Sequence, residues 1–230
     1  MASNHGLLIL IKVLGLDVGI ADGFAPRCPV HYDAIIFVSN CSLEGKIKRI
    51  GLCKVPSTAL RRAVKIAPVA AVQVEYSPFV REIENSASQN LLATCRKLGI
   101  AIVCYCPLGR CLLTGNITSH DSFAADGTDL RSTHFPWFTE EKIAANVALV
   151  ERFKGFAEKK GVSVGGRGFF FSIPGMWKVK YLEDNWGGKD VVLGKEEVAE
   201  IRMFVEENEV NGYRSVEMAK SFAYVDTREE

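Results

Sequence analysis

The residues best placed to do chemistry follow short apolar runs that are typical of buried strands. In a fold of parallel strands, ligands bind beyond the carboxyl ends of the strands, so the residues just after each strand matter most. Lys54 follows one such run, and Gln73 lies within the end of the next. The other strand-end positions fall in segments 105–110 and 174–178, and the second segment leads into residues 181–185. We therefore expect these positions to build a ligand site.

A second chemical signal is the glycine-rich cluster Gly165-Gly166-Arg167-Gly168. A turn of this kind can cradle a phosphate with backbone N–H groups, but the cluster matches neither GxGxxG nor GxxxxGK. A plain loop between a helix and the next strand is the alternative interpretation, and the sequence leaves both open.

The seven cysteines form no CxxC motif and no Cys/His pattern with zinc spacing. We interpret them as reduced, structural thiols of a cytoplasmic protein and expect no bound metal. Cys104 and Cys106 are two residues apart, a spacing that puts both side chains on one face of a strand.

The apolar stretch 6–15 resembles the core of a signal peptide only superficially. Lys12 interrupts it, no basic residue precedes it, and it lacks a clear cleavage site. It is also too short to span a bilayer. We expect a strand or another buried segment here.

Short apolar runs alternate with helical patterns along the chain, which favours βαβ units and a parallel sheet. We predict strands at 34–38, 47–52, 70–75, 100–104 and 169–173, the last of them buried. We predict helices at 57–67, 90–98, 139–160, 178–185 and 195–208. Ser57 or Thr58 is the expected N-cap of the first helix, and Gly99 ends the second. The long polar segment 116–138 is expected to be a functional or mobile loop.

The composition is that of an ordinary soluble globular protein, with 230 residues and 48% hydrophobic residues. Its 28 basic and 27 acidic residues nearly cancel, which argues against nucleic-acid binding through bulk positive charge. We expect one domain over residues 1–230, without a nucleic-acid or membrane partner, and the oligomeric state stays open. A closed α/β barrel usually needs roughly 250 residues, and this chain is shorter.

Several motifs together resemble the aldo-keto reductase family, in the family's order and near its spacing. They are Gly45–Leu52, Ala71–Ser77, Tyr105–Gly115, Asp129–Arg131, Asn146–Val150 and Ile173–Asn185. The recognisable part covers about 44–208, and its third motif is similar to the YSPLGRGFLTG type of loop. The resemblance implies an α/β fold, an incomplete or divergent (β/α)8 TIM-type barrel whose N-terminal strands are missing or unrecognisable. It also implies NADP(H) bound without a Rossmann glycine motif.

The resemblance assigns most of the strand-end residues to this cofactor. Gln73 would hold the nicotinamide carboxamide, which needs both a donor and an acceptor. Tyr105 would stack on the nicotinamide ring. The path of the pyrophosphate would be lined by Leu108, Gly109 and Arg110, since backbone N–H groups and a cation suit an anion.

The adenosine end of the cofactor would meet the last motif. By the same resemblance, Lys178 would contact the 2′-phosphate together with Lys180, and Asp184 and Asn185 would lie near the adenine. Trp177 stands where the family has a basic residue.

The family's catalytic Tyr, Lys, Asp and His have no counterpart that we can align, so we assign no catalytic residue. His31 and Tyr32 are weak substitutes, because they lie at the wrong end of the strand predicted at 34–38. Two further positions depart from the family pattern: Cys53 replaces a Ser, and Met176 replaces the Thr of an IPGT motif.

The resemblance favours an oxidoreductase that uses NADPH to reduce a small aldehyde or ketone, and we suggest a step in secondary metabolism as its place. A non-catalytic cofactor-binding or regulatory module is the first alternative. A degenerate, inactive paralogue or a wrongly joined gene product is the second.

Overall fold

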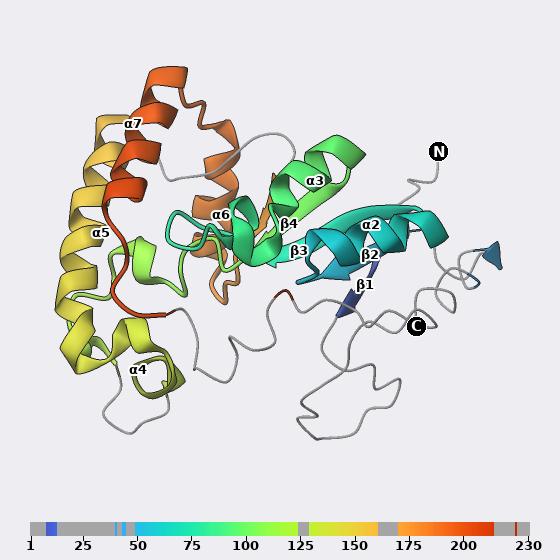
Figure 1. Ribbon diagram of the computed structural model, residues 1–230. Coiled ribbons are helices and arrows are strands. Elements are labelled where there is room, and N and C mark those ends of the chain that lie inside the picture. The colour runs from blue at the N-terminus through green and yellow to red at the C-terminus, as the bar shows by residue number, and fades with distance from the viewer. Residues whose placement is uncertain are drawn as a thin grey trace. The chain divides into compact units, whose positions relative to one another are not determined.

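The computed structural model describes residues 8–12, 40, 43–44, 49–123, 129–160, 170–213 and 224. The chain divides into two compact units. Figure 1 labels the helices and strands and colours the described residues by residue number. Unit 1 contains the described residues up to Glu75 and the segment Arg81–Val103. Unit 2 contains Tyr76–Val80 and the described residues from Cys104 to Tyr213.

Unit 1 is built on neighbouring strands joined by helices. The strands are, in order across the sheet, β1 (Leu8–Lys12), β2 (Arg49–Cys53), β3 (Val69–Glu75) and the start of β4 (Ala101–Tyr105). β1 runs parallel to β2, and β2 runs parallel to β3 with Leu52 opposite Val72. α2 (Ser57–Ile66) connects β2 to β3, and α3 (Leu91–Leu98) precedes β4. The predicted βαβ order is therefore confirmed in this unit.

The ends of the two helices in unit 1 follow the predicted signals only in part. The Asn90 side chain accepts a hydrogen bond from the backbone N–H of Ala93 (3.2 Å), and Gly99 ends α3 at φ +67° as predicted. The N-cap predicted for α2 is wrong, because Pro56 occupies that position. Ser57 is instead buried, and its Oγ shares a 2.7 Å hydrogen bond with Oγ1 of Thr94.

Unit 2 contains the end of β4 and most of the helical residues. In the sheet order, β5 is the strand next to β4. The elements of unit 2 are α4 (Leu130–His134), α5 (Glu140–Lys160), β5 (Phe170–Ile173), α6 (Val179–Gly187) and α7 (Lys195–Glu207), with short 3-10 turns between them. α7 lies alongside α5, since the ring of Phe204 contacts the rings of Phe153 and Phe156 (Figure 1). A prediction was made for four of these elements, and each of the four, α5, β5, α6 and α7, lies within about two residues of its predicted position.

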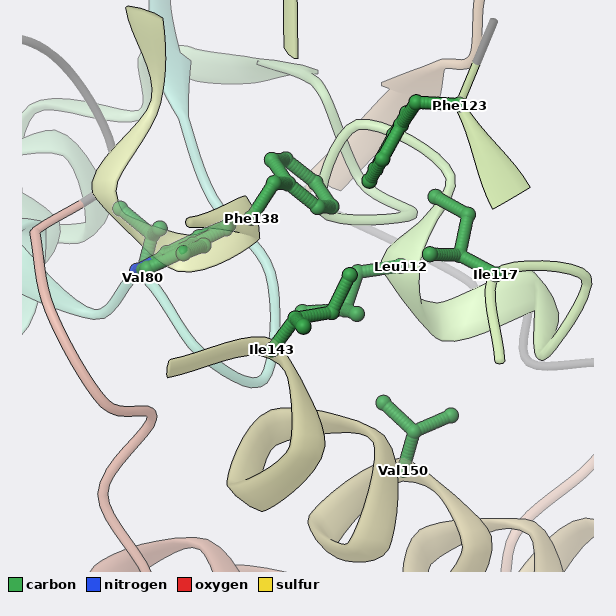
Figure 2. Packing of buried hydrophobic residues seen from close by; sticks show 8 residues of the cluster. Val80, Leu112, Ile117, Phe123, Phe138, Ile143 and Val150 are labelled. Atoms are coloured by element: carbon green, nitrogen blue, oxygen red, sulfur yellow. The ribbon is translucent and has the colours of Figure 1, made fainter. Parts of the chain in front are cut away.

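The core of unit 2 joins the segment after β4 to the first half of α5. Figure 2 shows Ile143 and Val150 of α5 facing Leu112, with Phe138 and Phe123 above them. The buried cluster consists of Val80, Leu112, Ile117, Phe123, Trp137, Phe138, Ile143 and Val150. The predicted apolar face of this helix is therefore confirmed, with Val147 partly buried against the same cluster.

Two predictions for unit 2 are wrong. The segment 116–138 is not a loop throughout: it contains α4 and two 3-10 turns, and Trp137 and Phe138 are buried. Their large aromatic surfaces drive this part of the segment into the core. β5 is not a buried strand, since Phe171 is 55% exposed and Ile173 is 44% exposed. It is the last strand in the sheet order of the described residues, so no further described strand covers its edge.

Several sequence predictions lie outside the described residues. They concern the strand at 34–38, His31, Tyr32 and the glycine-rich cluster at 165–168. Among the helices that the structure describes, none combines the length and the apolar character needed to cross a membrane.

We predict that Phe138→Ala destabilises unit 2 by about 3–5 kcal/mol, because it removes a fully buried ring from the cluster. Urea denaturation followed by circular dichroism measures the change. The matched control is Phe171→Ala, which removes the same ring from an exposed position and should cost no more than about 0.5 kcal/mol. Equal losses from the two variants would contradict this description of the core.

Candidate functional site

The segment that follows β4 is a tight series of turns with an unusual backbone. Cys106, Arg110 and Cys111 all have positive φ values (50°, 54° and 73°), as do Gly109 and Gly115. Hydrogen bonds hold this shape, including those from Gly109 N–H to Cys106 O and from Leu112 N–H to Gly109 O, both 3.0 Å. Left-handed backbone at residues other than glycine is costly and clusters at functional sites. We call residues 106–115 the β4 loop.

For this reason Cys104 and Cys106 do not share one face of a strand, although the strand predicted at 100–104 is confirmed. β4 ends at Tyr105, and the left-handed turn at Cys106 directs the chain away from the strand. Cys104 is buried, whereas Cys106 is half-buried.

The ion pair between Asp129 and Arg131 supports the β4 loop. The guanidinium of Arg131 donates from Nε to both carboxylate oxygens of Asp129 (2.9 and 3.1 Å), and its Nη1 donates to the carbonyl oxygen of Arg110 (3.2 Å). The hydrogen bond from Arg131 lowers the pKa of Asp129, and the same bond raises the pKa of Arg131. The two charges compensate each other, and Arg131 still donates from Nη1 to hold the loop.

The side chain of Arg110 is held differently. Its guanidinium carbon lies 4.1 Å from the centre of the Phe135 ring, a cation–π contact. Its Nε atom is buried and has no hydrogen-bond partner among the described residues. A buried donor without an acceptor is costly, so this position favours an anion that brings one.

A cavity of about 1100 Å³ opens within unit 2 beside the β4 loop. One wall is the loop itself, with Leu108 and Cys111, and another is the end of α5, with Phe153. The third wall consists of residues of 175–191, among them Trp177 and Asn185. The volume slightly exceeds the usual range for small-molecule sites, so it has room for a ligand of dinucleotide size.

Lysine side chains lie at two places near this cavity. Lys154 lines it and forms an ion pair with Glu151 of the same helix. A Cβ atom at Gly115 would lie 1.9 Å from the Cε of Lys154, a contact that the flexible lysine side chain could relieve, and it is the positive φ of Gly115 (+69°) that favours glycine there. Lys178 is exposed at the N-cap of α6, with its ammonium nitrogen 4.9 Å from the Trp177 ring centre and 5.9 Å from that of Tyr181.

The predicted cofactor residues are only partly brought together. Leu108, Asp184 and Asn185 line the cavity. Gly109 and Arg110 belong to the same loop without lining it, and Lys178 adjoins the lining residues Trp177 and Tyr181.

Tyr105 and Gln73 are not among the residues that line the cavity. Tyr105 ends β4, where its carbonyl oxygen accepts a hydrogen bond from the Tyr76 N–H (3.4 Å). Gln73 belongs to unit 1, on β3, and its Oε1 atom lies 3.8 Å from the Cys53 Sγ.

Sequence reasoning missed the part played by the Asp129–Arg131 pair, which it used only as a family motif. The signal was the spacing of the two residues. Asp129 and Arg131 are two residues apart at the start of a helix, where a carboxylate and a guanidinium can form a bidentate ion pair. The contribution of Phe135 beneath Arg110 had no comparable signal.

None of the described cysteines, 53, 95, 104, 106 and 111, forms a disulfide bond. Burial raises the pKa of Cys95 and of Cys104 to about 12, which leaves almost no reactive thiolate at neutral pH. This agrees with a structural role for these two residues.

Comparisons with known proteins point to one family. The sequence model of the aldo/keto reductase family matches residues 26–206. The chain is 41% identical to aldo-keto reductase str7 of Strobilurus tenacellus over 202 residues, which covers 84% of this chain and 59% of that protein. It is 37% identical to aldo-keto reductase yakc [NADP(+)] of Schizosaccharomyces pombe, covering 97% of this chain and 68% of the relative. The chain thus spans about three fifths to two thirds of the length of these relatives.

Solved structures support the fold. The glycerol dehydrogenase AKR11B4 from Gluconobacter oxydans matches 78% of this chain and 55% of its own, with a TM-score of 0.65 and 22% identity. The thermostable aldo-keto reductase Tm1743 matches 86% of this chain and 59% of its own, with a TM-score of 0.58 and 17% identity. Together with the parallel strands β1 to β3, these matches confirm the predicted incomplete barrel.

We predict that Asp129→Asn destabilises the protein at pH 7 and that the difference from the unaltered protein shrinks in acid. The pKa of Asp129 is lowered in the folded state, so its stabilisation is complete above the unfolded pKa, about 3.9, and is lost as the pH falls through the lower folded value. Urea denaturation between pH 7 and pH 3 measures this difference. Asp121→Asn, at an exposed position, is the control. A difference that stays constant down to pH 3 would contradict the assignment.

Proposed function

Because this chain belongs to the aldo/keto reductase family, we propose that it binds NADP(H) in the cavity of unit 2 and takes part in reducing an aldehyde or ketone. NADPH would supply the hydride for such a reduction. The chain covers only 59% of one of its relatives, so both the activity and the substrate class are proposals for the whole protein.

The observation that carries this proposal is the buried, unsatisfied Nε of Arg110. The carboxylate of Asp129 is already paired with Arg131, and no described residue offers Arg110 an acceptor. A phosphate oxygen would supply that acceptor and would form a charge-assisted hydrogen bond. The residues therefore fit the pyrophosphate of a dinucleotide at the β4 loop, of which Leu108 and Cys111, though not Arg110, line the cavity.

The rest of unit 2 suits the remainder of the same ligand. Leu108 offers an apolar wall, and Asn185 is a half-buried amide on the opposite wall, able to donate and accept. Asp184 lies beside it on the same wall. The name of the fission-yeast relative specifies NADP(+), which favours the phosphorylated dinucleotide over NAD.

The nicotinamide end is assigned by resemblance to Gln73 and Tyr105. Gln73 is half-buried at the end of β3, and its amide offers both a donor and an acceptor for a carboxamide. Tyr105 presents an aromatic face at the end of β4. In this assignment, Gln73 and Tyr105 orient the nicotinamide ring, and the β4 loop binds the pyrophosphate.

Binding without turnover is the second candidate function. It is favoured by one observation: the sequence keeps residues for the cofactor but has no alignable counterpart of the family's catalytic Tyr, Lys, Asp and His. A panel of aldehydes and ketones with NADPH distinguishes the two, since only the reductase consumes NADPH. A place in secondary metabolism and a cytoplasmic location stay predictions.

We predict that Arg110→Met weakens NADPH binding about tenfold or more, which corresponds to roughly 1.4 kcal/mol or more of binding free energy. Methionine keeps an apolar side chain against Phe135 but removes the donor and the charge. Titration of NADPH fluorescence measures the affinity. The control is Arg96→Met, on the exposed side of α3 in unit 1, which should bind like the unaltered protein. Unchanged affinity in the Arg110 variant would overturn the proposed anion site.

We predict that Lys178→Ala reduces the preference for NADPH over NADH about threefold to tenfold, because an exposed cation gives a screened and modest contribution. The loss should fade as salt is raised. Parallel titrations with both nucleotides measure the preference, with Lys195→Ala on α7 as the control. Equal losses for NADPH and NADH would remove Lys178 from the 2′-phosphate site.

A further inference from the structure

Residues 208–213 follow α7 and lie across the start of α5. The buried side-chain amide of Asn146 connects the two segments. We call residues 208–213 the C-terminal strap. Asn146 of α5 is 1% exposed and makes three hydrogen bonds with its side chain. Its Oδ1 accepts from the backbone N–H of Asn211 (2.6 Å), and its Nδ2 donates to the carbonyl oxygens of Asn211 (3.0 Å) and Trp137 (2.9 Å). The amide thus pairs with the strap as a neighbouring strand would, and both polar atoms of the side chain have partners.

Trp137 is the second attachment point of the strap. Its indole is 1% exposed, and its Nε1 donates to the carbonyl oxygen of Gly212 (3.0 Å). At the other end of the strap, the Asn208 side chain accepts from Arg152 (2.9 Å) and donates to the carbonyl oxygen of Phe204 (2.8 Å). Hydrogen bonds therefore hold the strap at both ends.

The same indole supports the β4 loop. Trp137 Cζ3 would lie 3.6 Å from a Cβ atom at Gly109, so the ring is in direct contact with this buried glycine. Two residues before it, Phe135 lies beneath the guanidinium of Arg110. A change in the position of Trp137 is therefore transmitted to both Gly109 and Arg110.

We propose that the C-terminal strap, acting through Asn146 and Trp137, holds the β4 loop in the conformation that binds the anion. Asn146 and Trp137 are positioning residues: neither needs to touch the ligand. The physical reason is preorganisation, since a loop with several left-handed residues relaxes unless its surroundings hold it. The consequence for NADPH rests on the proposed function, whereas the effect on the loop does not.

Two substitutions at one position test the strap. The Asn211 side chain is exposed, and the strap uses only the backbone of this residue to meet Asn146. Asn211→Pro removes the donating N–H, and Asn211→Ala keeps it, so the alanine variant is the matched control. Hydrogen exchange of the amides of Gly109, Leu112 and Leu113 reports on the loop in the absence of any ligand.

For Asn211→Pro we expect exchange of these loop amides to accelerate about tenfold, with the amides in the middle of α5 unchanged. NADPH affinity should fall about fivefold. Asn211→Ala should stay within about twofold on both measurements. Unchanged exchange in a folded proline variant would overturn the proposal.

A second variant keeps the test decisive if proline disrupts the fold. Trp137→Phe retains a ring against Gly109 but loses the hydrogen bond to Gly212, and it should show the same loop-specific acceleration in smaller measure. Equal exchange in this variant and in the unaltered protein would likewise overturn the proposal. If the unaltered protein binds no NADPH, the proposed function fails, and exchange still decides whether the strap holds the loop.

Discussion

The burial of Trp137 is the constraint on which the arrangement of unit 2 depends. Its ring belongs to the cluster formed by Leu112, Phe138 and Ile143, so burying it fixes the start of α5 relative to the β4 loop. An indole N–H in such a place needs an acceptor, and the carbonyl oxygen of Gly212 provides it. Its own carbonyl oxygen is satisfied by Asn146. One aromatic side chain thereby ties together three segments that are far apart in the sequence, and none of these contacts requires a charge.

Charged side chains also contact the β4 loop, and their positive and negative charges are not paired one to one. Of the two guanidinium groups at this loop, those of Arg110 and Arg131, only that of Arg131 pairs with the carboxylate of Asp129. Arg131 takes both oxygens of the carboxylate and leaves Arg110 with an aromatic ring and an unfilled donor. A cation–π contact compensates little of the cost of burying part of a guanidinium. Among these three side chains, one positive charge is in excess at the place where the backbone is most constrained, and this excess supports the proposed anion site.

The sequence predicted the positions of the helices and strands better than it predicted their tertiary contacts and burial. The helix over 139–160 was predictable because Ile143, Val147 and Val150 repeat at helical spacing, and the helix end at Gly99 because glycine tolerates a left-handed backbone. Ser57 was expected to cap α2, but its hydroxyl is drawn into a buried hydrogen bond with Thr94, a partner 37 residues away that no local rule reveals. The exposure of β5 and the burial of Trp137 depend in the same way on which segments meet. Of the candidate site, the motif residues Leu108, Asp184 and Asn185 were foreseen through the family resemblance, whereas the contacts of Arg110 with Phe135 and Arg131 depend on tertiary packing.

The division of the chain into two units separates two tasks that a dinucleotide site must perform. The residues suited to hold an anion, with Arg110 at their centre, all belong to unit 2, while Gln73 belongs to unit 1. Anion binding contributes most of the affinity for such a ligand, and contacts with the ring decide its orientation for hydride transfer. In the proposed function, the anion is held by residues of unit 2 alone, whereas the ring is assigned to Tyr105 of unit 2 and Gln73 of unit 1. Substitutions among the family's catalytic residues would then leave the proposed anion contacts of unit 2 intact.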